Sequence, residues 1–214
     1  MTEIRVRGVL FDMDGVLVRS EGSIERAWTA WAKRNGMPPA ETIQAAHGRR
    51  SIDTVRALRP DLDADSENAF IENLEVTDNA GLEVLPGVRE LLDALPHAQW
   101  TVVTGASRKL AIARLQAGGV PIPERMITGD DVLNGKPDPS SYQQGAALLG
   151  LAPKDCLVVE DAPAGVASGK AAGCKVLAAA ARKEWPLLMD ADYRVESLEV
   201  ISADVENGEI TLRY

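Results

Sequence analysis

The sequence predicts an α/β protein with a Rossmann-like parallel sheet core and a small inserted α-helical unit. Short apolar runs alternate with helical stretches along most of the chain. The apolar runs are continuous, as in strands buried on both faces of a parallel sheet. The segment from Ser20 to Asn79 breaks the alternation, because it has helical periodicity and no convincing strand.

The elements of the core follow from apolar runs and from helix start and stop signals. We expect strands at Ile4–Phe11, Gln99–Val103, Arg125–Ile127, Leu157–Val159 and Lys175–Ala178. We expect helices at Pro86–Leu92, Arg108–Ala117, Pro139–Leu149 and Ala164–Ala172. Proline suits a first helical turn, Ser107 suits an N-cap, and Gly118, Gly150 and Gly173 suit helix ends.

The inserted segment reads as several short helices. Ile24, Ala27, Trp28 and Trp31 recur at helical spacing, so we expect the two tryptophans in the core of this unit. Asn35-Gly36 and Pro38-Pro39 mark a break, and further helices are expected at Ser51–Leu58 and Asp65–Thr77. At the far end of the chain, Glu209–Arg213 is expected to form an edge strand.

Composition limits the partners of the protein. The 214 residues carry a net charge of −9, which argues against general nucleic-acid binding. No apolar run approaches the roughly 20 residues that cross a bilayer, and the start of the chain lacks a signal-peptide pattern. We therefore expect a cytoplasmic protein, a monomer or weak homodimer, without membrane or nucleic-acid partners. Cys156 and Cys174 are expected to be small buried residues and not zinc ligands.

Polar residues follow the predicted strands, where ligands bind in an open parallel sheet. Asp12 and Asp14 follow the first strand, Thr104 and Gly105 follow the second, and Glu160 and Asp161 follow the fourth. Lys136 precedes a helix in the same region. Each feature alone is weak, since a lone lysine is usually at the surface and an acidic pair is usually a solvated loop. Their shared position at the strand ends is what predicts a site.

This combination suits phosphoryl transfer. Clustered carboxylates need a cation, and Mg²⁺ takes carboxylate and phosphate oxygens. A carboxylate can act as nucleophile, a second one can move the proton, and a lysine can stabilise developing negative charge. The run Gly165–Ala171 imitates a P-loop, but it has one residue too few between its glycines and lacks the Ser/Thr. We expect it to be a helix that packs closely on the sheet.

Four motifs in order, FDMDGVL, VVTGAS, GKPDP and VVEDAPAG, resemble those of the haloacid dehalogenase superfamily. HGRRSIDTVRALRPDL and VLPGVRELLDAL are similar to the sugar- and polyol-phosphate phosphatases, including glycerol-3-phosphate and 2-deoxyglucose-6-phosphate enzymes. The resemblance implies an α/β core formed by residues 1–15 and 84–214 and a mobile helical cap formed by residues 16–83.

The resemblance also implies roles for the residues named above. Asp12 would attack phosphorus and bind Mg²⁺, and Asp14 would be the general acid/base and offer its carbonyl to the metal. Asp161 would complete the metal site, with Glu160 bound directly or through water. The phosphoryl group would be held by Thr104, the Gly105 and Ala106 amides, and Lys136.

The substrate is left open by the motifs. His47, Arg49 and Arg50 lie in a loop of the cap that would enter the crevice, although a solvated basic turn is an equal alternative. The expected reaction is hydrolysis of a small sugar or polyol phosphate through an aspartyl-phosphate. A β-phosphoglucomutase-type phosphomutase, a phosphoglycolate-like phosphatase and a non-catalytic binding protein are the alternatives. Val16, where many members have Thr, also occurs in active members, and Asp14 argues against carbon–halogen cleavage.

Overall fold

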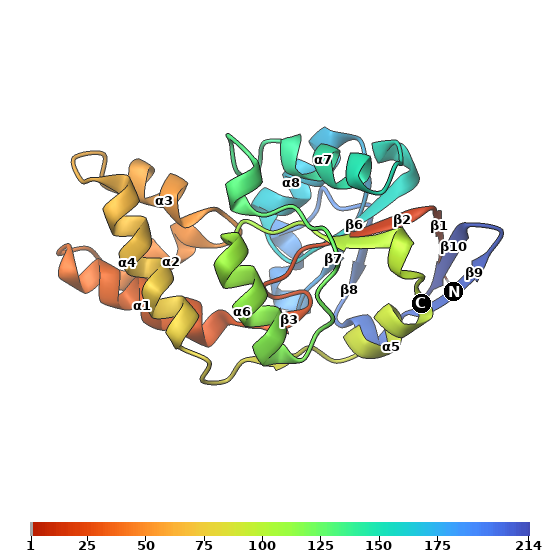
Figure 1. Ribbon diagram of the computed structural model, residues 1–214, viewed down its shortest axis with the longest axis horizontal. Helices are drawn as coiled ribbons and strands as arrows, with labels where there is room; N and C mark the ends of the chain where they lie inside the picture. Colours follow the sequence, from red (N-terminus) through yellow and green to blue (C-terminus); the bar gives the residue numbers. More distant parts are fainter. Residues whose placement is uncertain (1) are drawn as a thin grey trace.

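The computed structural model describes residues 2–214, in which a sheet-based core lies beside a group of helices (Figure 1). The central sheet has the strand order β5-β2-β6-β7-β8, and all its neighbouring strands are parallel. The strands are β2 (Gly8–Phe11), β5 (Trp100–Val102), β6 (Cys156–Glu160), β7 (Lys175–Ala179) and β8 (Tyr193–Val195). The predicted α/β fold class with a parallel sheet core is confirmed.

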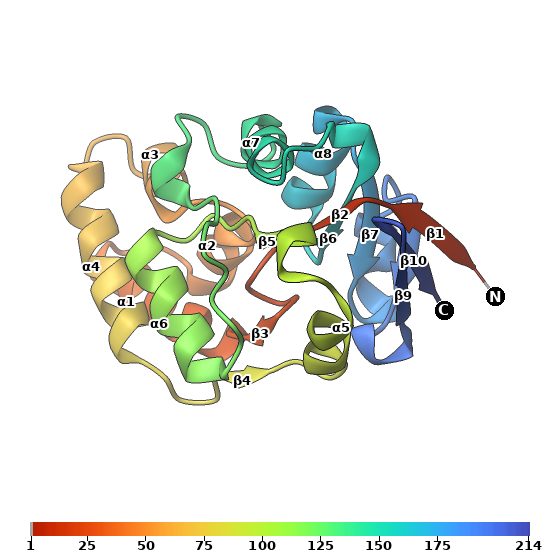
Figure 2. The ribbon, with the colours of Figure 1, turned by 45° about the vertical axis from the view of Figure 1, so that its right-hand side comes forward.

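Helices cover both faces of this sheet, because neighbouring residues of each buried strand point to opposite sides. Val9 and Phe11 of β2 belong to one apolar cluster, and Leu10 belongs to a second. The first cluster includes residues of α5 (Val88–Ala94) and α6 (Arg108–Gly118), and the second includes residues of α7 (Ser140–Leu148) and α8 (Pro163–Ala172). Figure 2 shows α7 and α8 together on one side of the sheet.

The start of α6 follows its capping signal, whereas α5 begins at Val88, two residues after the predicted start at Pro86. The Ser107 side chain accepts a hydrogen bond from the Leu110 N–H at 3.2 Å, as expected for the N-cap of α6. That helix includes Gly118, one residue beyond the predicted end, and its C-cap is Gly119, which has a φ of +66°. Short 3-10 helices are found at His97–Gln99, Gly129–Asp131, Pro153–Asp155, Arg182–Leu187 and Leu198–Val200.

The predicted strand Ile4–Phe11 is wrong as a single element, since it divides at Arg7 into β1 (Glu3–Val6) and β2. Alternate residues of β1 are exposed, whereas β2 is buried throughout, so the two halves suit different sheets. β1 pairs with β10 (Glu209–Arg213), which pairs with β9 (Ser202–Glu206), all antiparallel. β10 is therefore the middle strand of a three-stranded sheet and not the predicted edge strand.

Two further details of the core differ from the prediction or were not foreseen. Arg125–Ile127 is not a strand, because it meets the sheet only through an isolated bridge between Val103 and Ile127. Asn207 and Gly208, both with positive φ, form the turn of the β9–β10 hairpin, which is an Asn-Gly signal that our sequence reasoning missed. Cys156 and Cys174 are free and buried, as expected.

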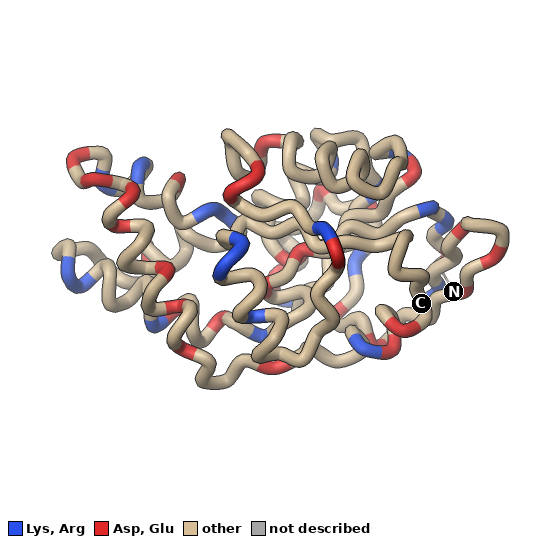
Figure 3. Tube along the Cα trace, in the orientation of Figure 1, with Lys and Arg blue, Asp and Glu red and all other residues tan. Residues whose placement is uncertain are grey.

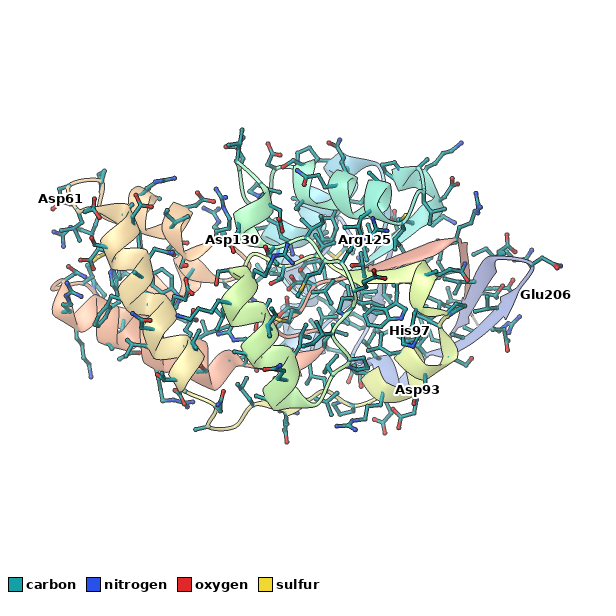
Figure 4. The ribbon with its side chains drawn as sticks, in the orientation of Figure 1. Asp61, Asp93, His97, Arg125, Asp130 and Glu206 are labelled. Carbon is teal, nitrogen blue, oxygen red and sulfur yellow. The ribbon has the colours of Figure 1, made fainter. Side chains whose placement is uncertain are left out.

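The inserted segment forms its own helical unit with a separate apolar cluster that includes Trp28 and Trp31. Its helices are α1 (Glu21–Arg34), α2 (Pro39–Ala46), α3 (Ser51–Leu58) and α4 (Ala64–Thr77). It joins the core through β3 (Val18–Arg19) and β4 (Glu83–Val84), which pair with each other. Asp61 of this unit and Glu206 of β9 mark opposite ends of the molecule (Figure 4). No helix within residues 2–214 has the length and apolar character needed to cross a membrane.

Candidate active site

A cavity of about 720 Å³ lies between the strand ends of the core and the helical unit. Its lining includes most of the predicted site residues, namely Asp12, Asp14, Thr104, Gly105, Ala106, Lys136, Asp161, His47, Arg49 and Arg50. The parallel strands bring these residues together because β2, β5 and β6 all end at the same edge of the sheet. Glu160 is 1% exposed and lies behind this lining.

Lys136 links two buried carboxylates. Its Nζ donates hydrogen bonds to Asp12 Oδ1 and Glu160 Oε1, both at 2.7 Å, and to the Val103 carbonyl at 3.2 Å. Burial alone would lower the pKa of Lys136, but the negative charges of Asp12 and Glu160 outweigh this and raise it. Burial raises the pKa of Asp12, and Lys136 opposes that rise. The lysine therefore remains charged and holds the Asp12 carboxylate in a fixed orientation.

Both oxygens of Glu160 have partners within the protein. Besides Lys136, the Tyr142 hydroxyl donates to Oε1 at 2.7 Å, and the backbone N–H groups of Asp161 and Ala162 donate to Oε2. A Cβ at Gly165 would lie 1.7 Å from Oε1, so only glycine fits there. The Gly165–Ala171 run lies within α8, as predicted for a closely packed helix. Glu160 thus orients Lys136 and the start of the next loop.

Asp161 approaches Asp12 across the loop that follows β2. Carboxylate oxygens of Asp12, Glu160 and Asp161 lie within 4.8 Å of one another. A Cβ at Gly15, whose φ is +77°, would lie 2.0 Å from Asp161 Oδ2, so glycine is needed for this approach. Burial raises the pKa of Asp161 to about 6. Converging, buried carboxylates are the donor set of a hard divalent cation, and they fit Mg²⁺.

The turn after β5 places the Thr104 hydroxyl beside the cavity. Thr104 is 3% exposed, and its Oγ1 accepts a hydrogen bond from the Ala106 N–H at 3.1 Å. This bond leaves the Thr104 hydroxyl proton available to an anion, while the Ala106 amide is engaged in the present arrangement. A Cβ at Gly105 would meet the backbone of Arg49 and Arg50 at 3.5 Å, so the helical unit lies directly over this turn. Figure 4 shows Asp130 at the neighbouring start of α6, where it accepts from the Arg108 N–H at 2.8 Å.

The loop between α2 and α3 contacts the catalytic side of the core. His47 Nε2 lies 3.4 Å from Asp161 Oδ2, and this contact raises the pKa of His47 to about 8. A Cβ at Gly48, whose φ is +71°, would lie 2.5 Å from the Ala162 Cβ. The Arg49 side chain is exposed and forms no hydrogen bond or ion pair with the residues that the structure describes. The structure therefore shows the helical unit seated on the core.

Arg50 has a different role from the substrate contact predicted for it. All five of its N–H donors are used within the protein, and its side chain is 9% exposed. Its partners are the Asp53 carboxylate and the carbonyls of Gly129, Val132 and Leu133. In this conformation Arg50 joins the helical unit to the core, which leaves Arg49 as the arginine of the pair with donors available to a ligand.

Three residues at the site were missed by sequence reasoning. Tyr142 binds Glu160, while Arg114 of α6 binds both Asp14 and Glu75. The signal for Arg114 was its position, since helical spacing places it with the buried Leu110, Ala111 and Leu115. No local pattern marks Tyr142 or Glu75, because their partners lie far away in the sequence.

Comparison with known proteins agrees with this geometry. The family model for haloacid dehalogenase-like hydrolases matches residues 6–173. Hexitol phosphatase A of Escherichia coli K12 is 43% identical over 98% of this chain and all of its own length. Glycerol-1-phosphate phosphohydrolase 2 of Saccharomyces cerevisiae is 33% identical over 96% of this chain and 88% of its own.

A solved structure shows the same fold. The β-phosphoglucomutase of Clostridium difficile superposes with a TM-score of 0.76 at 20% identity, over 91% of this chain and 92% of its own. The family resemblance of the four motifs is therefore confirmed. The chain belongs to the haloacid dehalogenase-like hydrolase family and is a phosphatase of that family.

Proposed function

We propose that this phosphatase hydrolyses phosphate monoesters of small polyols or sugars, with Asp12 as the nucleophile. The observation that carries the proposal is the placement of the Asp12 carboxylate, which is buried at a strand end, held by Lys136 at 2.7 Å and open to the cavity. The similarity to hexitol phosphatase A and glycerol-1-phosphate phosphohydrolase 2 supports this substrate class.

In the proposed reaction, an oxygen of Asp12 attacks phosphorus and the bond to the ester oxygen breaks. Asp14 gives its proton to the departing alkoxide, which leaves as the alcohol. Asp14 then takes a proton from water, and the water oxygen attacks the aspartyl-phosphate, which releases inorganic phosphate and restores Asp12. Thr104 holds the transferring group, while Lys136, whose three donors bind Asp12, Glu160 and the Val103 carbonyl, keeps Asp12 aligned and adds a positive charge beside it.

Asp12 and Asp161, with the Asp14 carbonyl, would hold Mg²⁺ in this proposal. When bound, the cation would offset the charge of the phosphoryl oxygens and of the clustered carboxylates. Glu160 would act through water or through its hydrogen bonds, because Lys136, Tyr142 and two amides already occupy its oxygens.

The wall of the cavity favours a substrate whose alcohol part is uncharged. Beyond the strand ends, its carboxylates include Glu21, Glu25, Glu72, Glu184 and Glu196. Hydroxyl groups of a polyol can donate to such carboxylates, whereas a carboxylate in the substrate would be repelled. Arg19, Arg49 and Lys183 also line the cavity, so its wall carries cations as well, although fewer than its carboxylates.

The test is release of inorganic phosphate, with Mg²⁺ present, from hexitol, glycerol and sugar phosphates, with phosphoglycolate and 6-phosphogluconate as the anionic comparison. We expect the uncharged polyol and sugar esters to have the higher kcat/KM, and Asp12→Asn to abolish turnover. A preference for phosphoglycolate would overturn the substrate class. Fast interconversion of sugar phosphate isomers with little phosphate release would overturn hydrolysis and favour a phosphomutase.

A further inference from the structure

Arg114 connects the proposed acid/base to the helical unit. Its Nη1 donates to Asp14 Oδ2 at 2.7 Å, and its Nη2 donates to Glu75 Oε1 at 3.1 Å. The side chains of Arg114 and Glu75 are 3% and 7% exposed. Buried charges are costly unless they are paired with good geometry. Each of these three charged groups therefore depends on the other two for its stability.

The three charged side chains, Asp14, Arg114 and Glu75, connect the core with the helical unit. Asp14 follows β2, Arg114 lies on α6 of the core, and Glu75 lies on α4 of the helical unit. Figure 3 shows acidic segments along α4 and basic segments on α6. Lys109 and Glu72, 3.7 Å apart, form a second ion pair between these helices, but Lys109 is 61% exposed and does not bind Asp14 among the residues that the structure describes.

The two oxygens of Asp14 are not equivalent in this arrangement. Oδ2 accepts from Arg114, whereas Oδ1 is buried and has no hydrogen-bond partner among the residues that the structure describes. A carboxyl group that is fixed through one oxygen presents the other in a defined direction. Asp14 lines the cavity, and Oδ1 is its oxygen without a competing partner, so Oδ1 is the oxygen left to exchange a proton with a ligand that reaches it.

We propose that Arg114 is a positioning residue that holds Asp14 with Oδ1 toward the ester oxygen of the substrate, and that Glu75 fixes Arg114 when the helical unit is seated on the core. This inference rests on the proposed function, in which Asp14 protonates the leaving alcohol. It assigns Glu75 an effect on the chemistry of the core although its own helix belongs to the inserted unit.

The test compares two esters of similar shape, phenyl phosphate and p-nitrophenyl phosphate. The p-nitrophenolate leaves readily without a proton, whereas phenolate depends more on the acid. We expect Arg114→Met to lower kcat/KM for phenyl phosphate about 100-fold more than for p-nitrophenyl phosphate, as general acid catalysis is worth about 100-fold or more. The ratio of kcat/KM for phenyl phosphate to kcat/KM for p-nitrophenyl phosphate should also fall in Glu75→Gln, but by less. Lys109→Met, which breaks the other ion pair between α4 and α6, should leave the ratio unchanged.

A double-mutant cycle decides whether Arg114 acts through Asp14. The ratio for Asp14→Asn should fall as in Arg114→Met, and the double variant should fall no further. Equal losses on both esters, or a fully additive cycle, would overturn the proposal. Arg114→Lys, which keeps the charge but cannot bind both carboxylates in one plane, gives the same comparison if the methionine variant does not fold. If the unmodified enzyme releases no phosphate from any ester, the proposed function fails instead.

Discussion

A methyl group at Gly15 tests how closely Asp161 must approach the loop that carries Asp12. The added Cβ would lie 2.0 Å from Asp161 Oδ2, and ordinary contact begins at 3.4 Å, so one of the two must move by about 1.4 Å. The φ of +77° adds strain of roughly 1–2 kcal/mol for alanine. Misplacement of a catalytic group by about 1 Å can cost about 100-fold in rate. We therefore expect Gly15→Ala to lower kcat/KM by about 100-fold or more and to raise the Mg²⁺ concentration for half-maximal activity.

Gly150→Ala is the matched control for this prediction. Gly150 has a φ of +70°, and its added Cβ would have no contact within 4 Å among the described residues. Both variants should lose about 1–2 kcal/mol in the free energy of unfolding, measured by denaturant titration, because the backbone strain is similar. Only Gly15→Ala should lose activity and Mg²⁺ affinity. If Gly15→Ala keeps the activity and Mg²⁺ dependence of Gly150→Ala, the close approach of Asp161 is not needed and the reasoning fails.

Three other variants test the helical unit. Arg50→Met should lower the free energy of unfolding by about 2 kcal/mol or more, because three carbonyls lose a charged donor. Arg49→Met should change the free energy of unfolding by less than about 0.5 kcal/mol and should raise KM. Equal effects of the two variants in denaturation and in kinetics would contradict this. Gly48→Ala should raise KM, because its Cβ would lie 2.5 Å from the Ala162 Cβ and lift the loop from the core; an unchanged KM would show that the loop can yield. Burial raises the pKa of Glu75 from 4.5 to about 7, so the stability it contributes is present below pH 4.5 and is lost as pH rises through about 7. As pH rises from about 5 to 8, Glu75→Gln should therefore gain stability relative to the unmodified protein in denaturation curves. If the difference in free energy of unfolding between the two proteins does not change with pH, the carboxyl is ionised throughout.

The strand-end residues could be predicted because their signal is local. Asp12, Thr104 and Glu160 each follow a continuous apolar run directly, and parallel strands bring such positions to one edge. The division of the first strand had a weaker local signal, which was not used. Ile4 and Val6 alternate with charged residues up to Arg7, whereas Val9–Phe11 is continuously apolar, and the pairing with β10 makes the first half part of another sheet.

The residues that orient the catalytic groups were harder to predict for a related reason. Arg114 lies 100 residues from Asp14 and 39 from Glu75, so no spacing along the chain relates the three. Arg50 illustrates a limit of local sequence context. Its sequence context, beside Arg49 in a basic loop, suggested a substrate contact, but the carbonyls of the 3-10 segment at Gly129–Asp131 and beyond it lie within reach of its donors.

The helical unit contacts the candidate site at several points, which gives it a part in the proposed catalysis even where it supplies no reacting atom. Three of its contacts with the core each reach a different component of the site. Gly48 lies against Ala162 beside Asp161, Arg50 binds the loop next to the Thr104 turn, and Glu75 binds the arginine that holds Asp14. If the unit moves away, all three components lose a contact at once, so in the proposed function the seated position would assemble the site as well as enclose it. Substrate groups that bind the inserted unit would then raise the rate of the chemical step, which is how binding energy far from phosphorus would favour one alcohol over another.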